Sequence, residues 1–354
     1  MELMTDQTKS AKPVKFTIWH YIPVVLILGL AGYFLYPQIA SLTRSWYVVK
    51  SMTLWAVIAA AVTETISWIG NGVIFYYILK ANGRKMSIFR GSLIAIGTLA
   101  VSLVAGGGVG LAVSYGWLYR ESKDGNSAFL AGTMPAFFNT GTIMAVSIIG
   151  VIYLFFVHDL STGQLIQFGI ALLFLGFVAA VTIAGMRSEK LVKKVADWGL
   201  SRWAKIRQQT YNSEQVFSDI DKFFIASKSM GNGRWSLALL GAVINVGFDM
   251  LTMFFLFIAA GHQISAGTLF AGYGLPLVLA KVAFIFPGGI GVVESSMNGL
   301  FASLGVPRAI SVVVVMSYRL FSFWIPTILG FGAAAFLSGK FFHKHKTEKE
   351  ENPD

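Results

Sequence analysis

The sequence predicts an all-α polytopic membrane protein with six spanning helices and two re-entrant hairpins, arranged as an inverted repeat. Hydrophobic residues make up 55% of the 354 residues and charged residues only 13%, so most of the chain is too apolar to face water. Eight apolar blocks each reach the length of about 20 helical residues that a bilayer core requires. These two observations exclude an ordinary soluble enzyme.

The eight blocks are separated by polar connections. In chain order they are Trp19 to Ile39, Met52 to Leu79, Ile88 to Tyr119, Phe129 to Val157, Leu165 to Met186, Trp235 to Ala260, Thr268 to Leu304 and Ala309 to Leu337. The first block follows several lysines, as in a signal peptide, but it is long and no convincing small-residue cleavage site follows it. We therefore expect a retained anchor, with a tail at 1–17, a membrane domain at 18–338 and a charged tail at 339–354.

Positive charge marks the connections that we expect to be cytoplasmic. The formal net charge is +11, and Lys and Arg concentrate in the 80–90 connection, the 187–234 linker and the C-terminal tail. If every block crossed once, the 187–234 linker would emerge opposite the Lys-bearing N-terminus. All the basic segments emerge on the cytoplasmic side if the third block is a hairpin that enters from the cytoplasm and the seventh block is a hairpin that enters from outside. Both termini are then cytoplasmic, in a bacterial plasma membrane.

The same assignment predicts two related halves. The second, third and fourth blocks recur as the sixth, seventh and eighth at an offset of about 180 residues. Repeat A covers about 52–157 and repeat B about 235–338. Because the two hairpins enter from opposite faces, the repeat is inverted, and in transporters of that kind the substrate site lies between the halves. Chance spacing of similar hydrophobic lengths is the alternative.

The basic linker between the halves, residues 187–234, carries apolar residues at helical spacing, among them Leu191, Val195 and Trp198. This pattern predicts one or two amphipathic helices in the lipid headgroup layer. A solvated linker is the alternative.

Glycine interrupts both predicted hairpins. The expected hinge residues are Gly106, Gly107, Gly108 and Pro287, and the second break continues with Gly288, Gly289 and Gly291. Glycine permits the change of direction, and proline removes an N–H donor before the second turn. Exposed amides at the start of the next half-helix would then form an anion site. Close helix packing is the alternative role for these glycines.

Five ionisable side chains lie well inside the blocks. A charge at the bilayer centre costs about 2.5–3.5 kcal/mol on insertion scales, so such groups pair with each other or line a wet cavity. We expect a polar seam between the two halves, and the alternative is a set of interhelical ion pairs that bind no ligand. The five residues are Glu64, Asp249, Lys281, Glu294 and Arg319.

Two segments of the second half carry a family resemblance. Phe286 to Glu294 (Phe-Pro-Gly-Gly-Ile-Gly-Val-Val-Glu) and Tyr318-Arg319 with Pro326 after it resemble the lysylphosphatidylglycerol synthase transmembrane family, over residues 18–338. The first half departs from that family, because its Val104 to Gly110 segment has neither proline nor an acid.

The resemblance implies movement of a phospholipid, typically aminoacylated phosphatidylglycerol, from the inner to the outer leaflet, with resistance to cationic antimicrobial peptides. Arg319 and the amides after Pro287 would hold the lipid phosphate, and Lys281 would bind phosphate near one mouth. The three acids would balance a headgroup ammonium or stabilise Arg319. The expected partners are the phospholipid, a separate lipid synthase and a second copy of the chain, and no nucleic acid.

We expect no enzyme activity, cofactor or metal site, although the family name implies a phosphatidylglycerol lysyltransferase. The chain ends soon after its last block, which leaves no segment for a soluble transferase domain, and it contains no Cys. Two alternatives stay open. One is an ion-coupled transporter of a small anionic solute, and the other is an intramembrane lipid-modifying enzyme with Glu64 or Glu294 as general base.

Overall fold

The structure is a computed structural model that describes residues 46–157, 160–207, 213–214, 216–218, 220–221, 224, 231–282 and 287–350. Within these ranges the chain is almost entirely helical and contains no strand. The expected first span, Trp19 to Ile39, and most of the second half of the 187–234 linker lie outside the described residues.

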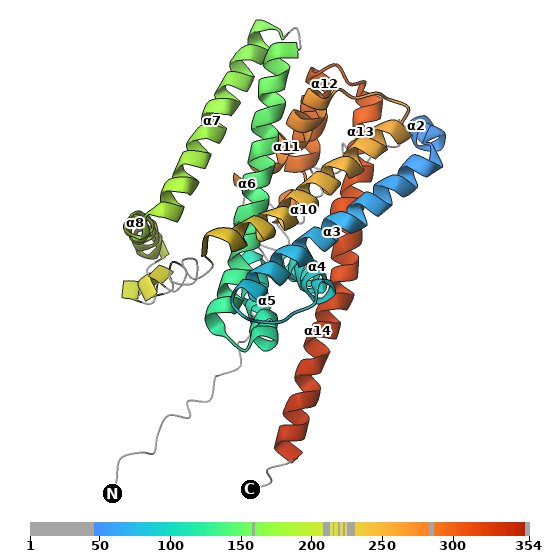
Figure 1. Ribbon diagram of the computed structural model, residues 1–354. Helices are drawn as coiled ribbons and strands as arrows, with labels where there is room; N and C mark the ends of the chain where they lie inside the picture. The colour runs from blue at the N-terminus through green and yellow to red at the C-terminus, as the bar shows by residue number, and fades with distance from the viewer. Residues whose placement is uncertain are drawn as a thin grey trace, which may run out of the picture.

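The helices follow one another with short connections (Figure 1). They are α2 (Trp46–Ser51), α3 (Leu54–Ala81), α4 (Ile88–Ala105), α5 (Gly107–Ser122), α6 (Gly125–Val157), α7 (Thr162–Arg187), α8 (Glu189–Arg207), α10 (Gly231–Ala259), α11 (Ala266–Val282), α12 (Val292–Ser303), α13 (Arg308–Arg319) and α14 (Ile325–Glu350). A 3-10 turn, η2 (Pro287–Gly289), precedes α12, and a π-helical turn, η3 (Leu320–Trp324), joins α13 to α14.

Six helical segments among the described residues are long and apolar enough to cross a membrane: α3, α4, α6, α7, α10 and the continuous run through α13 and α14. The chain is therefore a multi-pass integral membrane protein. Five of the six coincide with predicted spans. The sixth, α4, has 18 residues and meets the same criterion, although the sequence predicts it as one arm of a hairpin. The following α5 has 16 residues and α12 only 12, short of the roughly 20 that a crossing takes.

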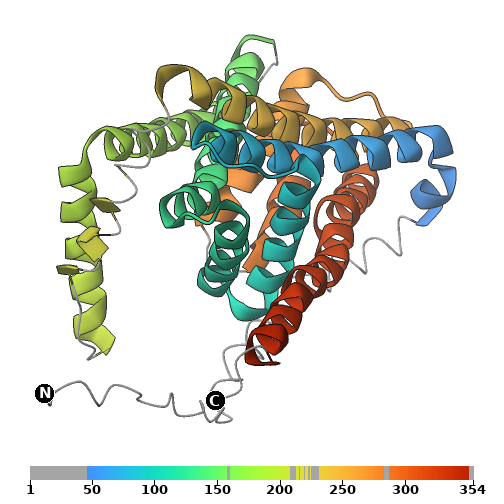
Figure 2. The same ribbon diagram turned by 60° about the horizontal axis from the view of Figure 1, so that its bottom comes forward.

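The first helices of the two predicted halves, α3 and α10, pack side by side and antiparallel (Figure 2). The amide of Thr53 donates to the carbonyl of Ala259 at 2.9 Å, and farther along the hydroxyls of Thr63 and Thr252 lie 3.0 Å apart. Glycine allows this close approach, because a Cβ on Gly241 would lie 2.8 Å from the backbone nitrogen of Ile74.

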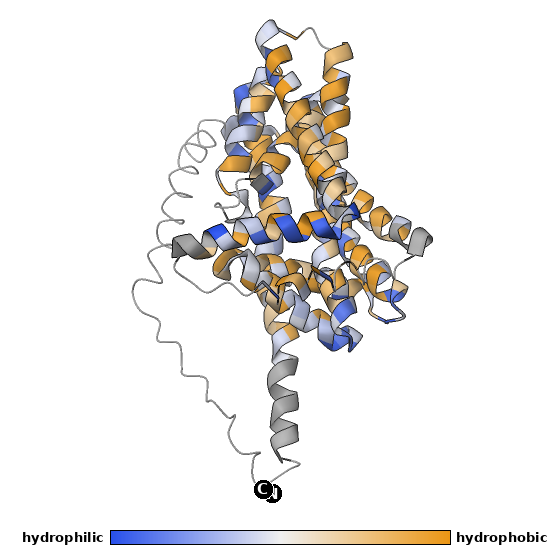
Figure 3. Cartoon of the chain, turned by 90° about the vertical axis from the view of Figure 1, so that its left-hand side faces the viewer, coloured by the Kyte–Doolittle hydropathy of each residue, from blue (hydrophilic) through white to orange (hydrophobic). Residues whose placement is uncertain are grey.

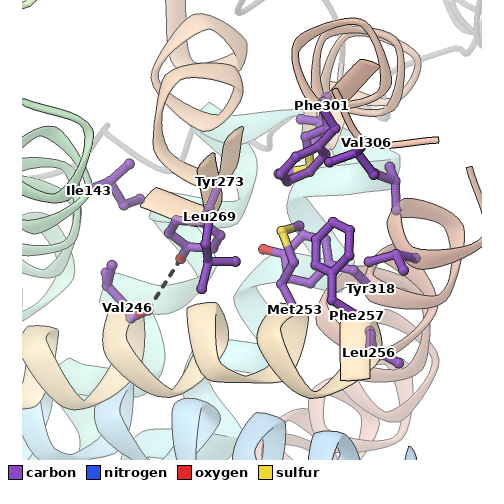
Figure 4. Packing of buried hydrophobic residues seen from close by; sticks show 14 of the residues in the cluster. Ile143, Val246, Met253, Leu256, Phe257, Leu269, Tyr273, Phe301, Val306 and Tyr318 are labelled. Carbon is purple, nitrogen blue, oxygen red and sulfur yellow. Dashed lines mark hydrogen bonds between the residues drawn. The ribbon is translucent and has the colours of Figure 1, made fainter. Parts of the chain in front are cut away.

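Other long helices pack around this pair. Helix α4 packs on α14, and α11 packs on α6. The end of α4 meets the second helix break, where Leu99 and Leu103 pack with Ile290 and Phe323. The largest core cluster lies where α10, α11, α12 and α13 meet (Figure 4).

Both helix breaks depend on glycine in the left-handed region of the backbone. The first occurs at Gly106 alone (φ 89°), since Gly107 and Gly108 already belong to α5. The predicted three-residue break is therefore one residue wide. At the second break Gly288, Gly289 and Gly291 have φ of 63°, 65° and 83°. A side chain at Gly288 would also collide with the ring of Phe323, 2.3 Å from an ideal Cβ.

Charged residues collect around the connections at one end of the bundle. Arg84 lies 4.0 Å from Asp124, and Arg90 Nη1 lies 2.6 Å from Glu121 Oε2. Hydrogen bonds from the side chain and the amide of Ser127 lower the pKa of the Asp124 carboxyl. The first pair joins the α3–α4 connection to the α5–α6 turn, and the second joins the start of α4 to the end of α5.

The first half of the basic linker is helical, as expected. Helix α8 runs across the direction of the long helices and carries mostly hydrophilic residues (Figure 3). Trp198 on this helix is exposed. At the other end of the chain, α14 continues to Glu350 through most of the predicted charged tail.

The glycine contact between α3 and α10 gives a stability prediction with a control on the same helix. Gly241→Ala places a methyl group against the backbone of α3, and we expect it to destabilise the protein by about 1–3 kcal/mol. Gly247→Ala meets no atom within 4 Å and gains helix propensity, up to about 1 kcal/mol. Thermal unfolding in detergent measures both, and equal shifts in Tm would contradict the close approach.

Candidate functional site

The central feature of the candidate site is a buried ion pair at the second helix break. Arg319 Nε donates to Glu294 Oε1 at 2.6 Å, and the two residues are 5% and 0% exposed. A terminal guanidinium nitrogen of Arg319 also donates to the carbonyl of Gly288 at 3.0 Å. The guanidinium carbon lies 4.2 Å from the ring centroid of Phe323, a cation–π contact.

Glu294 has a second role at the start of α12. Its Oε2 accepts the amide of Gly291 at 2.7 Å, which places a carboxylate at the positive end of the helix. The amides after Pro287 were expected to bind the lipid phosphate. The amide of Gly291 instead donates to the carboxylate of Glu294. Glu294 therefore positions both Arg319 and α12. Of its two expected roles, this favours stabilisation of Arg319 over balancing a headgroup ammonium.

A second polar cluster surrounds Asp249 on α10. Tyr273 and Tyr318 both donate to Asp249 Oδ2, at 2.7 and 2.8 Å. Figure 4 shows Tyr273 reaching from α11 toward α10, where its hydroxyl also lies 3.5 Å from the carbonyl of Val246. Because Tyr318 directly precedes Arg319, this cluster and the ion pair share helix α13.

Glu64 on α3 joins the same cluster. It is 2% exposed, its Oε1 accepts the indole N–H of Trp68 at 2.8 Å, and it lies across from Asp249 between the Thr63–Thr252 and Ser67–Asn245 contacts of α3 with α10. The structure thus brings together the two acids that the sequence placed in the first helix of each half.

Amide side chains extend the polar contacts along α3. Asn245 Nδ2 donates to Ser67 Oγ at 3.0 Å, and Asn139 Nδ2 donates to Asn71 Oδ1 at 2.8 Å. These contacts connect α3 to α10 and to α6. Together with the Asp249 cluster and the ion pair, these contacts form a set of buried and half-buried polar groups on α3, α6, α10, α11, α12 and α13, called the polar line below.

Lys281 does not join this line. It lies in the last turn of α11, its side chain is exposed, and it makes no ion pair among the residues that the structure describes. In the same described part of the chain, no three His, Cys, Asp or Glu side chains group closely enough to hold a metal ion.

An apolar cavity of about 270 Å³ lies between α7, α11 and α12. One polar residue, Ser296, lines it, and this residue stands two positions after Glu294 on α12. The remaining lining residues are Ala171, Phe174, Leu175, Leu275, Pro276, Val278, Leu279 and Leu300. Helix α12 thus carries both Glu294 of the ion pair and part of a surface that suits a hydrocarbon chain.

Sequence reasoning missed three parts of the site. Tyr273 and Tyr318 were not selected as site residues, although Tyr318 belongs to the Tyr-Arg motif. The π turn that follows Arg319 was also missed. Pro326, which lacks an N–H donor, is the sequence signal for an irregular helix there, and π turns are frequent at functional sites.

The ion pair gives a prediction about stability. Glu294→Gln or Arg319→Met alone leaves one buried charge without its partner, and we expect a loss of about 3–5 kcal/mol for each. The double variant removes both charges and should lose clearly less than the sum of the two single changes.

Thermal unfolding of the four proteins in detergent checks this coupling. Glu121→Gln is the matched control, because Glu121 forms a partly exposed pair with Arg90 that is worth at most about 1 kcal/mol. Additive losses in the double variant would show that Glu294 and Arg319 do not depend on each other.

Comparison with known proteins agrees with the transmembrane architecture. Residues 21–330 match the family described as the lysylphosphatidylglycerol synthase TM region. Over 97 residues the chain is 38% identical to a UPF0104 membrane protein of Pyrococcus horikoshii, a stretch that covers 27% of this chain and 29% of that protein.

Two further relatives have the same UPF0104 description. Identity is 29% over 124 residues with a protein of Methanocaldococcus jannaschii (34% of this chain, 37% of the relative). It is 32% over 97 residues with one of Methanothermobacter thermautotrophicus (27% and 28%). The match thus spans well under half the length of each of these archaeal relatives.

Proposed function

Because the chain belongs to the lysylphosphatidylglycerol synthase TM region family, we propose that it moves a phospholipid between the leaflets of the plasma membrane. The observation that carries the proposal is that α12 contributes both to the buried Arg319–Glu294 pair and to the lining of an apolar cavity. A phospholipid needs both kinds of surface, a partner for its charged headgroup and a place for its acyl chains. The proposed direction is from the inner to the outer leaflet.

Arg319 is the group suited to the lipid phosphate. A guanidinium has five N–H donors, and two hydrogen bonds of Arg319 go to Glu294 and Gly288 among the described residues. Arginine binds phosphate oxygens in a bidentate manner. Transfer of an ion into a medium of low dielectric constant has an idealised cost of order 20 kcal/mol, and offsetting charge within the protein reduces it.

The apolar cavity supports a lipid rather than a small solute. Its lining comes from α7, α11 and α12 and is almost entirely hydrocarbon, whereas a small anion would need polar groups there. Helix α7 also exposes large apolar side chains such as Ile170, Leu173 and Phe177. An acyl chain could therefore stay in an apolar environment while the headgroup follows the polar line.

We further propose that the two halves form an inverted repeat and rock about the α3–α10 contact. The antiparallel packing of α3 on α10 supports this arrangement, because a twofold axis in the membrane plane relates two helices in that way. The exchange of partners between halves, α4 on α14 and α11 on α6, also supports it. A hydrogen bond between Tyr318 and Asp249 joins α13 to α10. In the other half, a hydrogen bond between Asn139 and Asn71 joins the corresponding helices, α6 and α3.

The proposed hairpins are α4 with α5 and α11 with α12, entering from opposite faces. In Figure 1, α5 lies near one end of the bundle and α12 near the other. Contact of Leu103 with Ile290 and Phe323 supports a meeting of the two hairpin tips. Phe323 lies near the middle of the last apolar run, Arg308–Gly339, which favours a meeting point inside the bilayer.

Contacts between connections support the proposed topology, with both termini cytoplasmic. Arg84 with Asp124 joins two connections assigned to the cytoplasm. Gln164 Nε2 donates to the carbonyl of Ser303 at 2.6 Å, joining two segments assigned to the outside.

The substrate class that we propose is an anionic or aminoacylated phosphatidylglycerol. Its synthesis would be the task of a separate enzyme, and this chain would relocate the lipid without a change in covalent bonds. Surface charge, and with it resistance to cationic peptides, would follow from the leaflet that the lipid occupies. The relatives come from archaea, so this assignment is not specific to bacteria. A homodimer is a further proposal.

A leaflet-accessibility assay in proteoliposomes tests lipid movement. A headgroup-labelled phosphatidylglycerol should reach the outer leaflet faster with the native chain than without it. Arg319→Ala and Glu294→Gln should slow this exchange about 10- to 100-fold, the rate equivalent of about 1.5–3 kcal/mol for a charge-assisted hydrogen bond. Arg319→Lys keeps the charge and should fall between the native chain and Arg319→Ala.

Glu121→Gln is the control for this assay, because Glu121 lies in the charged end of the bundle and outside the proposed route. It should exchange lipid at the native rate. Native rates for Arg319→Ala and Glu294→Gln would remove both side chains from the mechanism.

Cysteine labelling tests the topology, since the chain contains no Cys. Asn126 and Ser303 are both exposed, in the α5–α6 turn and at the end of α12. A membrane-impermeant reagent should reach Asn126→Cys only from the cytoplasmic side and Ser303→Cys only from outside. Labelling of Asn126→Cys from outside would make α4 and α5 a full crossing and would overturn the proposed repeat.

A further inference from the structure

Glu64 and Asp249 form a carboxyl pair that phosphate binding does not explain. Glu64 and Asp249 lie on the contacting helices α3 and α10, between the Thr63–Thr252 and Ser67–Asn245 contacts, and each charge acts on the other. Each also has one buried oxygen without a hydrogen-bond partner, Glu64 Oε2 and Asp249 Oδ1. Glu64 is 2% exposed and Asp249 is half-buried, and both of these oxygens are buried.

Protein donors already saturate the opposite oxygen of each carboxyl. Trp68 donates to Glu64 Oε1, and both Tyr273 and Tyr318 donate to Asp249 Oδ2. The two remaining oxygens are therefore buried acceptors without a donor, on side chains of two contacting helices. A buried acceptor that lacks its hydrogen bond destabilises a protein by about 1–3 kcal/mol, and more when it is charged.

The groups packed around the pair do not balance two negative charges. Helix α11 contributes Tyr273, and α13 contributes Tyr318 and Arg319. Arg319 attracts Asp249 electrostatically, but its hydrogen bonds among the described residues go to Glu294 and Gly288. Two carboxylates in contact at low dielectric constant do not both stay ionised without a cation between them.

We propose that Glu64 and Asp249 bind one exchangeable proton between them, and that this proton is the coupling ion for lipid movement. One proton makes one carboxyl a donor and the other its acceptor, which satisfies both bare oxygens. It binds from the aqueous phase on one side and leaves to the other, with no change in covalent bonds to carbon. The coupling part rests on the proposed function, whereas the proton site does not.

The location of the pair explains how a proton could act on the lipid site. α3 and α10 are the helices at which the two halves meet, so loss of the proton would place two negative charges across that contact. Asp249 is also bonded to Tyr318, the neighbour of Arg319 on α13. Repulsion between Glu64 and Asp249 would therefore act on the phosphate site through α13.

A proton fits the pair better than a metal cation. Ca²⁺ takes six to eight oxygen ligands and Mg²⁺ an octahedral set. Among the described residues no third acid or His completes such a site. Hydroxyl donors from two tyrosines also suit a carboxyl group that shares a proton, because each donor stabilises the charge that remains.

Infrared difference spectroscopy of the purified chain in lipid nanodiscs tests the proton site without any transport. A protonated carboxyl has a C=O stretch that shifts in D₂O, and we expect one such band that titrates with pH in the native chain. The double variant Glu64→Gln/Asp249→Asn should lose it, and Glu121→Gln should keep it. Absence of the band from the native chain, or its persistence in the double variant, would overturn the proposal.

The pH dependence of lipid exchange in proteoliposomes tests the coupling. A single coupling proton changes the rate by up to about tenfold per pH unit in the native chain. In Glu64→Gln the amide donates permanently to Asp249 and imitates the protonated pair, so exchange should lose its pH dependence. Equal pH profiles for the native chain and Glu64→Gln would overturn the coupling.

The two measurements separate the inference from the proposed function. A titrating band in a chain that moves no lipid would support the proton site and contradict lipid movement. Lipid exchange without the band would support lipid movement and contradict the proton site. Stabilisation by Na⁺ at fixed pH in a chain without the band would assign the pair to a metal cation and would also overturn the inference.

Discussion

A charged side chain in a membrane helix is costly unless it pairs with another group or lines a wet cavity, and the Arg319–Glu294 contact provides such a pair in this chain. The contact does more than neutralise two charges. Glu294 begins α12 by accepting the amide of Gly291, and Arg319 holds the carbonyl of Gly288. One ion pair thus fixes the backbone on both sides of the second helix break, where Gly288, Gly289 and Gly291 have positive φ.

The same constraint orders the rest of the polar groups. Asp249 receives two tyrosine hydroxyls, one of them from the residue before Arg319, and Glu64 reaches Asp249 from the other half of the protein. Polar contacts therefore run through the interface of α3 and α10, while the apolar cavity lies beside α12. A polar route next to an apolar surface is what an amphipathic substrate needs, and this pairing is the physical basis for a lipid rather than a small solute.

Composition and hydrophobic length predicted the membrane class and most spans, because burial in lipid demands long apolar helices whatever the tertiary contacts are. The cost of an intramembrane charge likewise selected Glu64, Asp249, Glu294 and Arg319, all four of which lie in the polar line. It also selected Lys281, which is exposed, since the sequence alone does not tell which side of a helix end packs against the protein. Contacts between distant helices, such as Tyr273 with Asp249, have no local signal and required the structure.

Photocrosslinking tests the central claim, that a lipid headgroup passes Arg319, most directly. Trp324, which contacts the Phe323 ring stacked on Arg319, would be replaced by p-benzoylphenylalanine in a chain held in native lipid. The account predicts phospholipid adducts at this position, recovered by mass spectrometry, that largely disappear when Arg319→Ala is added. Adducts of equal yield in both backgrounds, or none in either, would contradict it.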